Sequence, residues 1–132
     1  MDFELFGDAQ ERIGYVDDLG GKMLPMPEAL KTDANFVKGC MSTVHIAARP
    51  KPGAGDVIEF LGDSNTPIVK GLIAIVQRVW SGQRAADVLA FDMQAFLRQI
   101  GLESLVTVQR RIGLEKVIER VREQASAIVG KQ

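Results

Sequence analysis

The segment from Thr66 to Gly82 constrains the fold more than any other part of this 132-residue chain. Thr66 is placed to cap a helix, Pro67 suits the first helical position, and Gly82 suits the end. Between them, apolar residues lie on most sides of the helix rather than in one stripe. They are Ile68, Val69, Leu72, Ile73, Ile75, Val76, Val79 and Trp80. A helix that is apolar on so many sides is buried. The pattern therefore predicts that this helix is the central element of the hydrophobic core.

Before this helix the apolar pattern changes to a period of two, which indicates β-strands. In residues 43–49 the apolar Val44, Ile46 and Ala48 alternate with polar side chains, and residues 56–62 form a second strand-like run. The stretch between the two runs is rich in Pro and Gly, so it predicts a turn and an antiparallel hairpin. A third strand is expected near residues 35–38.

Further helices are predicted on both sides of this small sheet, over residues 8–20, 28–31, 85–90, between Asp92 and Gly101, and over 108–129. Gly20 and Gly21 are expected to stop the first of them. Asp92 is an expected N-cap, with Phe91 and Phe96 at the spacing of a hydrophobic staple around it. Helices, then a small antiparallel sheet of about three strands, then helices predict an α+β fold in one domain, residues 1–132.

The composition excludes several classes of protein. Of the residues, 46% are hydrophobic and 25% charged, and a net charge of -1 argues against an electrostatic nucleic-acid binder. One Cys and one His cannot form an internal disulfide or a typical Cys/His zinc site. No Gly-rich phosphate-binding motif and no Gly-x-Ser-x-Gly elbow occur. With no apolar run near the ~18 residues of a membrane span and no secretory signal, we expect a cytoplasmic protein.

Cys40 is the one thiol of the chain, and we expect it in the loop that leads into the first strand. It follows Lys38 and Gly39 and precedes Met41 and Ser42. A lone cysteine in such a protein is most often a small buried hydrophobe. A loop composition with a nearby cation instead favours the thiolate, which is the reactive form. From the residues alone, both interpretations stay open.

Two further positions are candidates for roles beside the thiol. Along an extended chain at ~3.3 Å per residue, His45 lies up to roughly 16 Å from Cys40. We therefore expect no Cys–His pair, and place His45 on the polar face of an edge strand. Arg110 and Arg111 fall in the first turn of the last predicted helix, where the helix dipole disfavours a cation. They either form a solvated helix end or face an anionic group, such as the sulfur loop or an acidic partner.

Seven short segments then occur in order: Phe3-Glu-Leu-Phe-Gly, Asp18-Leu-Gly, Leu24-Pro with Pro27 nearby, Val37-Lys-Gly-Cys-Met-Ser-Thr-Val, Gly62-Asp-Ser-Asn, Ile68-Val-Lys-Gly-Leu and Gln109-Arg-Arg-Ile-Gly-Leu. Together they resemble the SufE/CsdE family of proteins that accept sulfur from cysteine desulfurases. The resemblance extends from Phe3 to about Ala127, and its most specific part is the Val-x-Gly-Cys string that ends at Cys40.

The resemblance implies an α+β fold related to the iron–sulfur scaffold proteins, and the function of a sulfur carrier and not of a stand-alone enzyme. The family's reactive thiol falls on Cys40 and its arginine near the last helix on Arg110. Cys40 would accept a persulfide sulfur from a SufS- or CsdA-like desulfurase and pass it to a cluster scaffold or another acceptor. Pyridoxal phosphate is expected in that partner, no cofactor or metal on this chain, and a monomer or weak dimer.

Three positions near the expected thiol site depart from the family pattern. Met41 stands where Gln is common, His45 where Trp is common, and Asn65 at a position that is frequently acidic. The residues expected to support Cys40 or to bind the partner are Lys38, Gly39, Met41, Ser42, His45, Asp63, Asn65 and Arg110. Two alternatives remain, a desulfurase-binding adaptor with an inert cysteine and a carrier for another sulfur-transfer pathway. An iron–sulfur scaffold is disfavoured, because one Cys cannot supply the roughly four ligands of a cluster.

Overall fold

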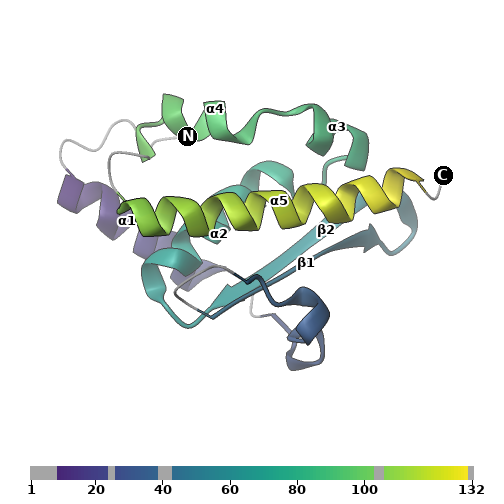
Figure 1. The fold of residues 1–132 in the computed structure, drawn as a ribbon, viewed down its shortest axis with the longest axis horizontal. Coiled ribbons are helices and arrows are strands. Elements are labelled where there is room, and N and C mark those ends of the chain that lie inside the picture. The colour runs from purple at the N-terminus through teal and green to yellow at the C-terminus, as the bar shows by residue number, and fades with distance from the viewer. Residues whose placement is uncertain (1–8, 24–25, 39–42, 103–105, 131–132) are drawn as a thin grey trace.

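The computed structural model describes residues 9–23, 26–38, 43–102 and 106–130, and shows helices packed around a β-hairpin (Figure 1). The elements are, in chain order, α1 (Ala9–Lys22), the 3-10 turns η2 (Glu28–Leu30) and η3 (Asp33–Asn35), β1 (Val44–Lys51), β2 (Ala54–Ser64), α2 (Pro67–Trp80), α3 (Ala85–Ala90), α4 (Met93–Gln99) and α5 (Val108–Gly130). This order confirms the predicted α+β fold. No helix in the described ranges is long and apolar enough to span a membrane.

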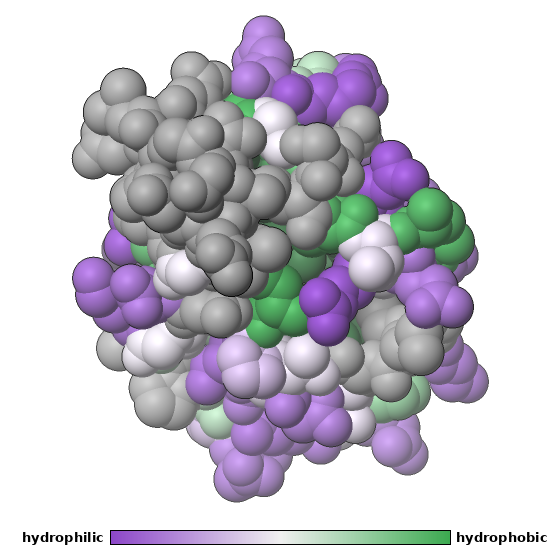
Figure 2. Space-filling view, turned by 90° about the vertical axis from the view of Figure 1, so that its left-hand side faces the viewer, coloured by the Kyte–Doolittle hydropathy of each residue, from purple (hydrophilic) through white to green (hydrophobic). Residues whose placement is uncertain are grey.

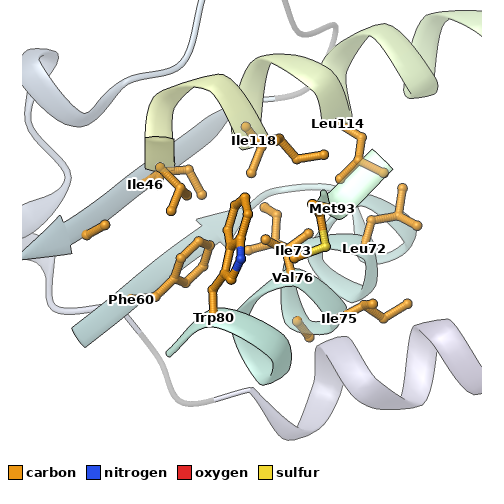
Figure 3. Packing of buried hydrophobic residues seen from close by; sticks show 14 of the residues in the cluster. Ile46, Phe60, Leu72, Ile73, Ile75, Val76, Trp80, Met93, Leu114 and Ile118 are labelled. Carbon is orange, nitrogen blue, oxygen red and sulfur yellow. The ribbon is translucent and has the colours of Figure 1, made fainter. Parts of the chain in front are cut away.

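The helix α2 is the centre of the core, as its apolar pattern predicts. Residues 71–76 and Trp80 are all buried. The helix packs against α1, β2 and α5, and the long α5 also covers β1 (Figure 1). Figure 3 shows Trp80 beside Phe60 of β2, with Ile118 of α5 on the same cluster. The hairpin, α2 and the apolar face of α5 therefore bury their side chains in one continuous core.

The strands β1 and β2 form the predicted antiparallel hairpin. Their register runs from Val44 opposite Ser64 to Pro50 opposite Ile58. The strands connect through Pro52 and Gly53, and Gly53 has a φ of 80°. A positive φ at the second central residue is what a type II turn requires, with Pro common before it. The turn chemistry therefore agrees with the strand pairing.

The prediction of a third strand near residues 35–38 is wrong, because the structure has only an isolated β-bridge there. Phe36 pairs antiparallel with His45, and the sheet of the described residues has two strands. The 3-10 turn η3 ends at Asn35, whose side-chain amide donates to the Leu30 carbonyl at 2.7 Å. The 3-10 turn therefore ends one residue before the bridge, so a strand cannot begin before Phe36.

The later helix ends follow their local signals. Asp92 caps α4, because its carboxylate accepts the backbone N–H three residues on at 3.0 Å. The Phe91 and Phe96 rings lie 5.9 Å apart, as a hydrophobic staple requires. Gly82 and Gly101 have φ values of 84° and 75° and confirm the predicted stops. The segment 28–31, predicted as a short helix, contains only the 3-10 turn η2.

Two other predicted helix signals, the stop at Gly20 and Gly21 and the cap at Thr66, do not act as predicted. The helix α1 does not stop at Gly20 and Gly21 but continues to Lys22, and Asp8, its expected first residue, lies outside the described residues. A Cβ on Gly20 would lie 2.7 Å from the backbone nitrogen of Gly71 in α2, so this glycine serves a close helix contact. Thr66 occupies the predicted N-cap of α2, but its side chain makes no capping hydrogen bond.

Candidate functional site

The expected reactive residue, Cys40, lies outside the described residues together with Gly39, Met41 and Ser42. The chain on both sides of these four residues is described. We call residues 38–43 the thiol segment, and the contacts of its two ends define what the structure says about this site.

The two residues that flank the thiol segment are joined to each other at the edge of the core. The Val37 N–H donates to the Val44 carbonyl at 2.9 Å, and both side chains are buried. Lys38 directly after Val37 and Thr43 directly before Val44 are exposed. On both sides of residues 39–42, the described chain therefore passes from a buried, hydrogen-bonded valine to an exposed residue.

His45 lies on β1, just after the thiol segment. It is half-buried, and its ring meets the edge of the Phe36 ring at 5.5 Å between centroids and 62° between planes. His45 was predicted on the polar face of an edge strand, and in the described residues β1 has β2 as its one strand partner, with the single bridge of Phe36 to His45 beside it. Because Phe36 and His45 pair antiparallel, the described chain before residue 39 and after residue 42 runs in opposite directions. Cys40 lies outside the described residues, so the absence of a Cys–His pair stays a prediction.

Asn65 holds the far end of the thiol segment. Its Oδ1 accepts the Thr43 N–H at 3.1 Å, and its own N–H donates to the Thr43 carbonyl at 3.3 Å. The Thr66 hydroxyl donates to the same Oδ1 at 3.2 Å. This clamp needs a side-chain oxygen at position 65, which both the Asn of this chain and an acidic residue would supply.

Asp63 of β2 forms ion pairs with Lys31 and with Lys70 of α2. Its carboxylate lies 2.9 Å from Nζ of Lys31, beyond η2, and 3.6 Å from Nζ of Lys70 in α2. The Ser64 N–H also donates to Oδ1 at 2.8 Å. Burial raises the pKa of Asp63, but the hydrogen bonds from Lys31 and Ser64 and the two lysine charges outweigh it, so the pKa is lowered. The bonds to Asp63 and to Glu28 raise the pKa of Lys31.

The structure brings three of the sequence-predicted residues to one hollow. A cavity of about 160 Å³ lies beside the end of the thiol segment, and its lining is Lys31, Thr43, His45, Asp63, Ser64 and Asn65. The hollow is lined by polar side chains of both charges, so it suits polar groups. In the described part of the chain, no three His, Asp or Glu residues are grouped as metal ligands.

The Asp63 ion pairs predict a specific pH dependence of stability. A carboxyl whose pKa is lower in the folded than in the unfolded chain stabilises the fold above its unfolded pKa of 3.8, and this stabilisation disappears as the pH falls through the folded pKa. Between about pH 7 and about pH 3, urea unfolding should therefore show a smaller loss of unfolding free energy in Asp63→Asn than in the wild type. Asp18→Asn, on the exposed face of α1, is the control and should follow the wild type. Equal losses in all three proteins would contradict the role of Asp63.

Arg110 lies in the first turn of α5, as predicted, and is exposed. Its N–H donates to the Thr107 hydroxyl at 3.2 Å. Its side chain borders a cleft of about 420 Å³ between the starts of α2 and α5, lined by Thr66, Val69, Leu72, Ile73, Thr107, Gln109, Arg110, Gly113, Leu114 and Val117. On the face seen in Figure 2, hydrophobic side chains lie open between hydrophilic ones. Arg110 is therefore not in the hollow, but Thr66 on the wall of its cleft is bonded to Asn65 of the hollow.

The sequence did not single out Lys31 and Lys70, the two partners of Asp63. Both ion pairs join residues from different elements, so no spacing rule within one helix or strand points to them. The only local signal is that Lys31 stands three residues after Glu28, with which it forms an ion pair.

Comparisons with known proteins agree with the resemblance in the sequence. A family model described as "SufE: Fe-S metabolism associated domain" matches residues 1–125. An uncharacterized SufE-like protein of Rhizobium meliloti is 35% identical over 125 residues, which cover 94% of this chain and 89% of that protein. A second one, of Rhizobium etli, is 35% identical over 128 residues, or 94% of this chain and 84% of that protein.

A solved structure shows the same fold. It is the solution structure of a hypothetical protein from Thermus thermophilus, with a TM-score of 0.81 and 21% sequence identity over 97% of this chain and 90% of that one. Its similarity supports the α+β architecture alone. Since the family model covers nearly the whole chain and two relatives match at 35% identity, this protein belongs to the SufE family, whose domain is associated with iron–sulfur metabolism.

Proposed function

We propose that this protein is a sulfur acceptor for a cysteine desulfurase. In this proposal Cys40 takes the terminal sulfur of a persulfide formed on the desulfurase and passes it on for iron–sulfur cluster assembly. Family membership supports the place in iron–sulfur metabolism. The acceptor role rests on the chain's only thiol and on the framework that holds the two ends of its segment.

The observation that carries the proposal is the anchoring of the thiol segment on both sides. Val37 and Val44 bond to each other, and Asn65 bonds both backbone groups of Thr43. With both flanks fixed, the four residues between Lys38 and Thr43 have a restricted reach, and the proposal places the reactive thiol of Cys40 within that reach. A sulfur carrier needs this arrangement, because the attacking thiolate must approach the persulfide in line.

The transfer is an exchange between two sulfur–sulfur bonds. The Cys40 thiolate attacks the terminal sulfur of the desulfurase persulfide, and a bond forms between Cys40 Sγ and that sulfur. The bond from that sulfur to the desulfurase cysteine breaks, and the cysteine leaves as a thiolate. No external oxidant or reductant is consumed. Pyridoxal phosphate acts in the partner in this proposal, and this chain supplies the thiol and its positioning.

The proposal is tested by mass spectrometry after incubation with a cysteine desulfurase and free cysteine. We expect the mass of one additional sulfur atom on the peptide that contains Cys40, and its loss on treatment with a reductant. Stimulation of the desulfurase without this adduct would show an adaptor with an inert cysteine. If the desulfurase is not stimulated and no sulfur adduct forms on the Cys40 peptide, the proposal is overturned.

Arg110→Ala should separate helix stability from partner activity. A cation in the first turn opposes the helix dipole by about 0.3–1 kcal/mol, so its removal should leave the melting temperature unchanged or slightly higher. If Arg110 favours the thiolate or contacts the desulfurase, stimulation should fall. Arg111→Ala, the neighbouring first-turn arginine, is the control and should retain stimulation.

A thiol-reactive probe used across a range of pH then distinguishes the two roles of Arg110. An upward shift of the Cys40 thiol pKa in Arg110→Ala would show activation through space, and an unchanged thiol pKa with weaker desulfurase binding would show docking. Unchanged thiol pKa, binding and stimulation would assign Arg110 to a solvated helix end.

A further inference from the structure

The chain that leads into the thiol segment is held by a side chain of the distant helix α5. Nη1 of Arg120 donates to the Ala34 carbonyl at 2.9 Å, and Nη2 donates to the Phe36 carbonyl at 3.1 Å. Carbonyls at the end of a helical turn lack partners within the turn, and the end of η3 is such a place. The planar guanidinium, with donors in a fixed fork, bridges the two carbonyls.

One turn later, α5 holds the strand that follows the thiol segment. Gln124 Oε1 accepts the Ala48 N–H of β1 at 2.7 Å. Its amide nitrogen lies 3.5 Å from the Ile46 carbonyl and 3.5 Å from Asn35 Oδ1. Arg120 and Gln124 together, which we call the α5 bracket, therefore fix both lengths of chain that flank the thiol segment.

The α5 bracket reinforces a short backbone pairing of residues 36–37 with β1, beside the buried side chain of Val37. They pair with β1 only through the bridge of Phe36 to His45 and the bond from Val37 to Val44. So short a pairing is weak in water by itself. The bonds from Arg120 carry a charge on the donor and are therefore among the stronger hydrogen bonds of a protein.

We propose that Arg120 is a positioning residue for sulfur transfer, which fixes the approach to the thiol segment by bonding Ala34 and Phe36. This inference rests on the proposed function of Cys40. Arg120 acts through the backbone and is not assigned a contact with the sulfur. Its removal should loosen the pairing of Val37 with Val44 and slow the acceptance of sulfur.

The chain offers a matched control on the same helix. Arg122 Nη2 donates to the Leu89 carbonyl at 3.0 Å, and Nη1 lies 3.4 Å from the Phe91 carbonyl. It makes the same kind of bridge as Arg120, but at the junction of α3 and α4. Arg122→Ala should therefore lower stability about as much as Arg120→Ala without touching the approach to the thiol segment.

The experiment compares Arg120→Ala, Arg120→Lys and Arg122→Ala with the wild type by amide hydrogen exchange and by the initial rate of sulfur acceptance from a desulfurase. In Arg120→Ala we expect the Val37 amide to exchange about tenfold faster, the change expected from the loss of a charge-assisted bond, and sulfur acceptance to slow. Arg120→Lys, which offers a point charge in place of a fork, should be intermediate. Arg122→Ala should match the wild type in both measurements.

The outcomes separate this inference from the proposed function. If Arg120→Ala and Arg122→Ala behave alike in exchange and in sulfur acceptance, Arg120 has no positioning role. If Val37 exchanges faster but sulfur acceptance stays at the wild-type rate, the α5 bracket is structural only and the inference is overturned. If the wild type itself takes no sulfur on Cys40, the proposed function fails, which is visible before any variant is compared.

Discussion

Gly71→Ala should destabilise the protein by about 3 kcal/mol or more, because the added methyl group meets backbone that cannot move aside. Gly71 is buried in α2 where α1 crosses it. A Cβ on Gly71 would overlap the Val16 carbonyl and lie 2.6 Å from Val16 Cγ1. Both helices would have to separate, and the core around α2 would lose packing on that side. Urea and thermal unfolding measure the effect, and we expect a much lower yield of folded protein.

Gly21→Ala is the control for this substitution. It lies on α1, near Gly20, but nothing lies within 4 Å of its added Cβ. Alanine has a higher helix propensity than glycine, so this variant should gain up to about 1 kcal/mol. A Gly71→Ala protein as stable as the wild type would mean that α1 and α2 are not in close contact at this point.

Cys40→Ser should abolish the acceptance of sulfur, because a serine hydroxyl cannot form a persulfide. We expect the unfolding free energy to change by less than about 0.5 kcal/mol, as for a substitution outside the core. The measurement pairs the sulfur adduct, read by mass spectrometry, with the urea unfolding midpoint. A severely destabilised Cys40→Ser protein would identify Cys40 as a packed core residue and would contradict the carrier function.

The stimulation of the desulfurase by Cys40→Ser gives a second result. A carrier that relieves the desulfurase of its persulfide loses this stimulation with the thiol, whereas an adaptor retains it. Asn65→Asp is the control near the same segment, because it keeps the oxygen that accepts the Thr43 N–H. It should retain sulfur acceptance, which shows that the loss in Cys40→Ser comes from the thiol.

Much of the fold was predictable because its signals are local. The buried helix α2, the hairpin with its Pro52–Gly53 turn and the Asp92 cap each depend on residues a few positions apart. The stop predicted at Gly20 was wrong because a glycine ends helices and also permits close helix contacts. The sequence of one helix does not show which of the two applies, since the deciding neighbour is in another helix.

The site was predictable only in part. The resemblance pointed to Asp63 and Asn65, and the structure shows them with His45 around one hollow beside the thiol segment. The partners of these residues were not predictable. The bond from Arg120 to Ala34 joins positions 86 residues apart, and polar contacts of this kind have no periodicity in the sequence.

The place of α5 in the chain has a consequence for synthesis on the ribosome. This helix follows every element that it packs against, and it alone carries Arg120 and Gln124. A nascent chain can therefore form the β1–β2 hairpin early, but residues 34–36 gain their long-range bonds only after α5 has emerged. Contacts so distant along the chain form slowly. The thiol segment is therefore synthesised long before the contacts of Arg120 and Gln124 with the chain on its two sides can form.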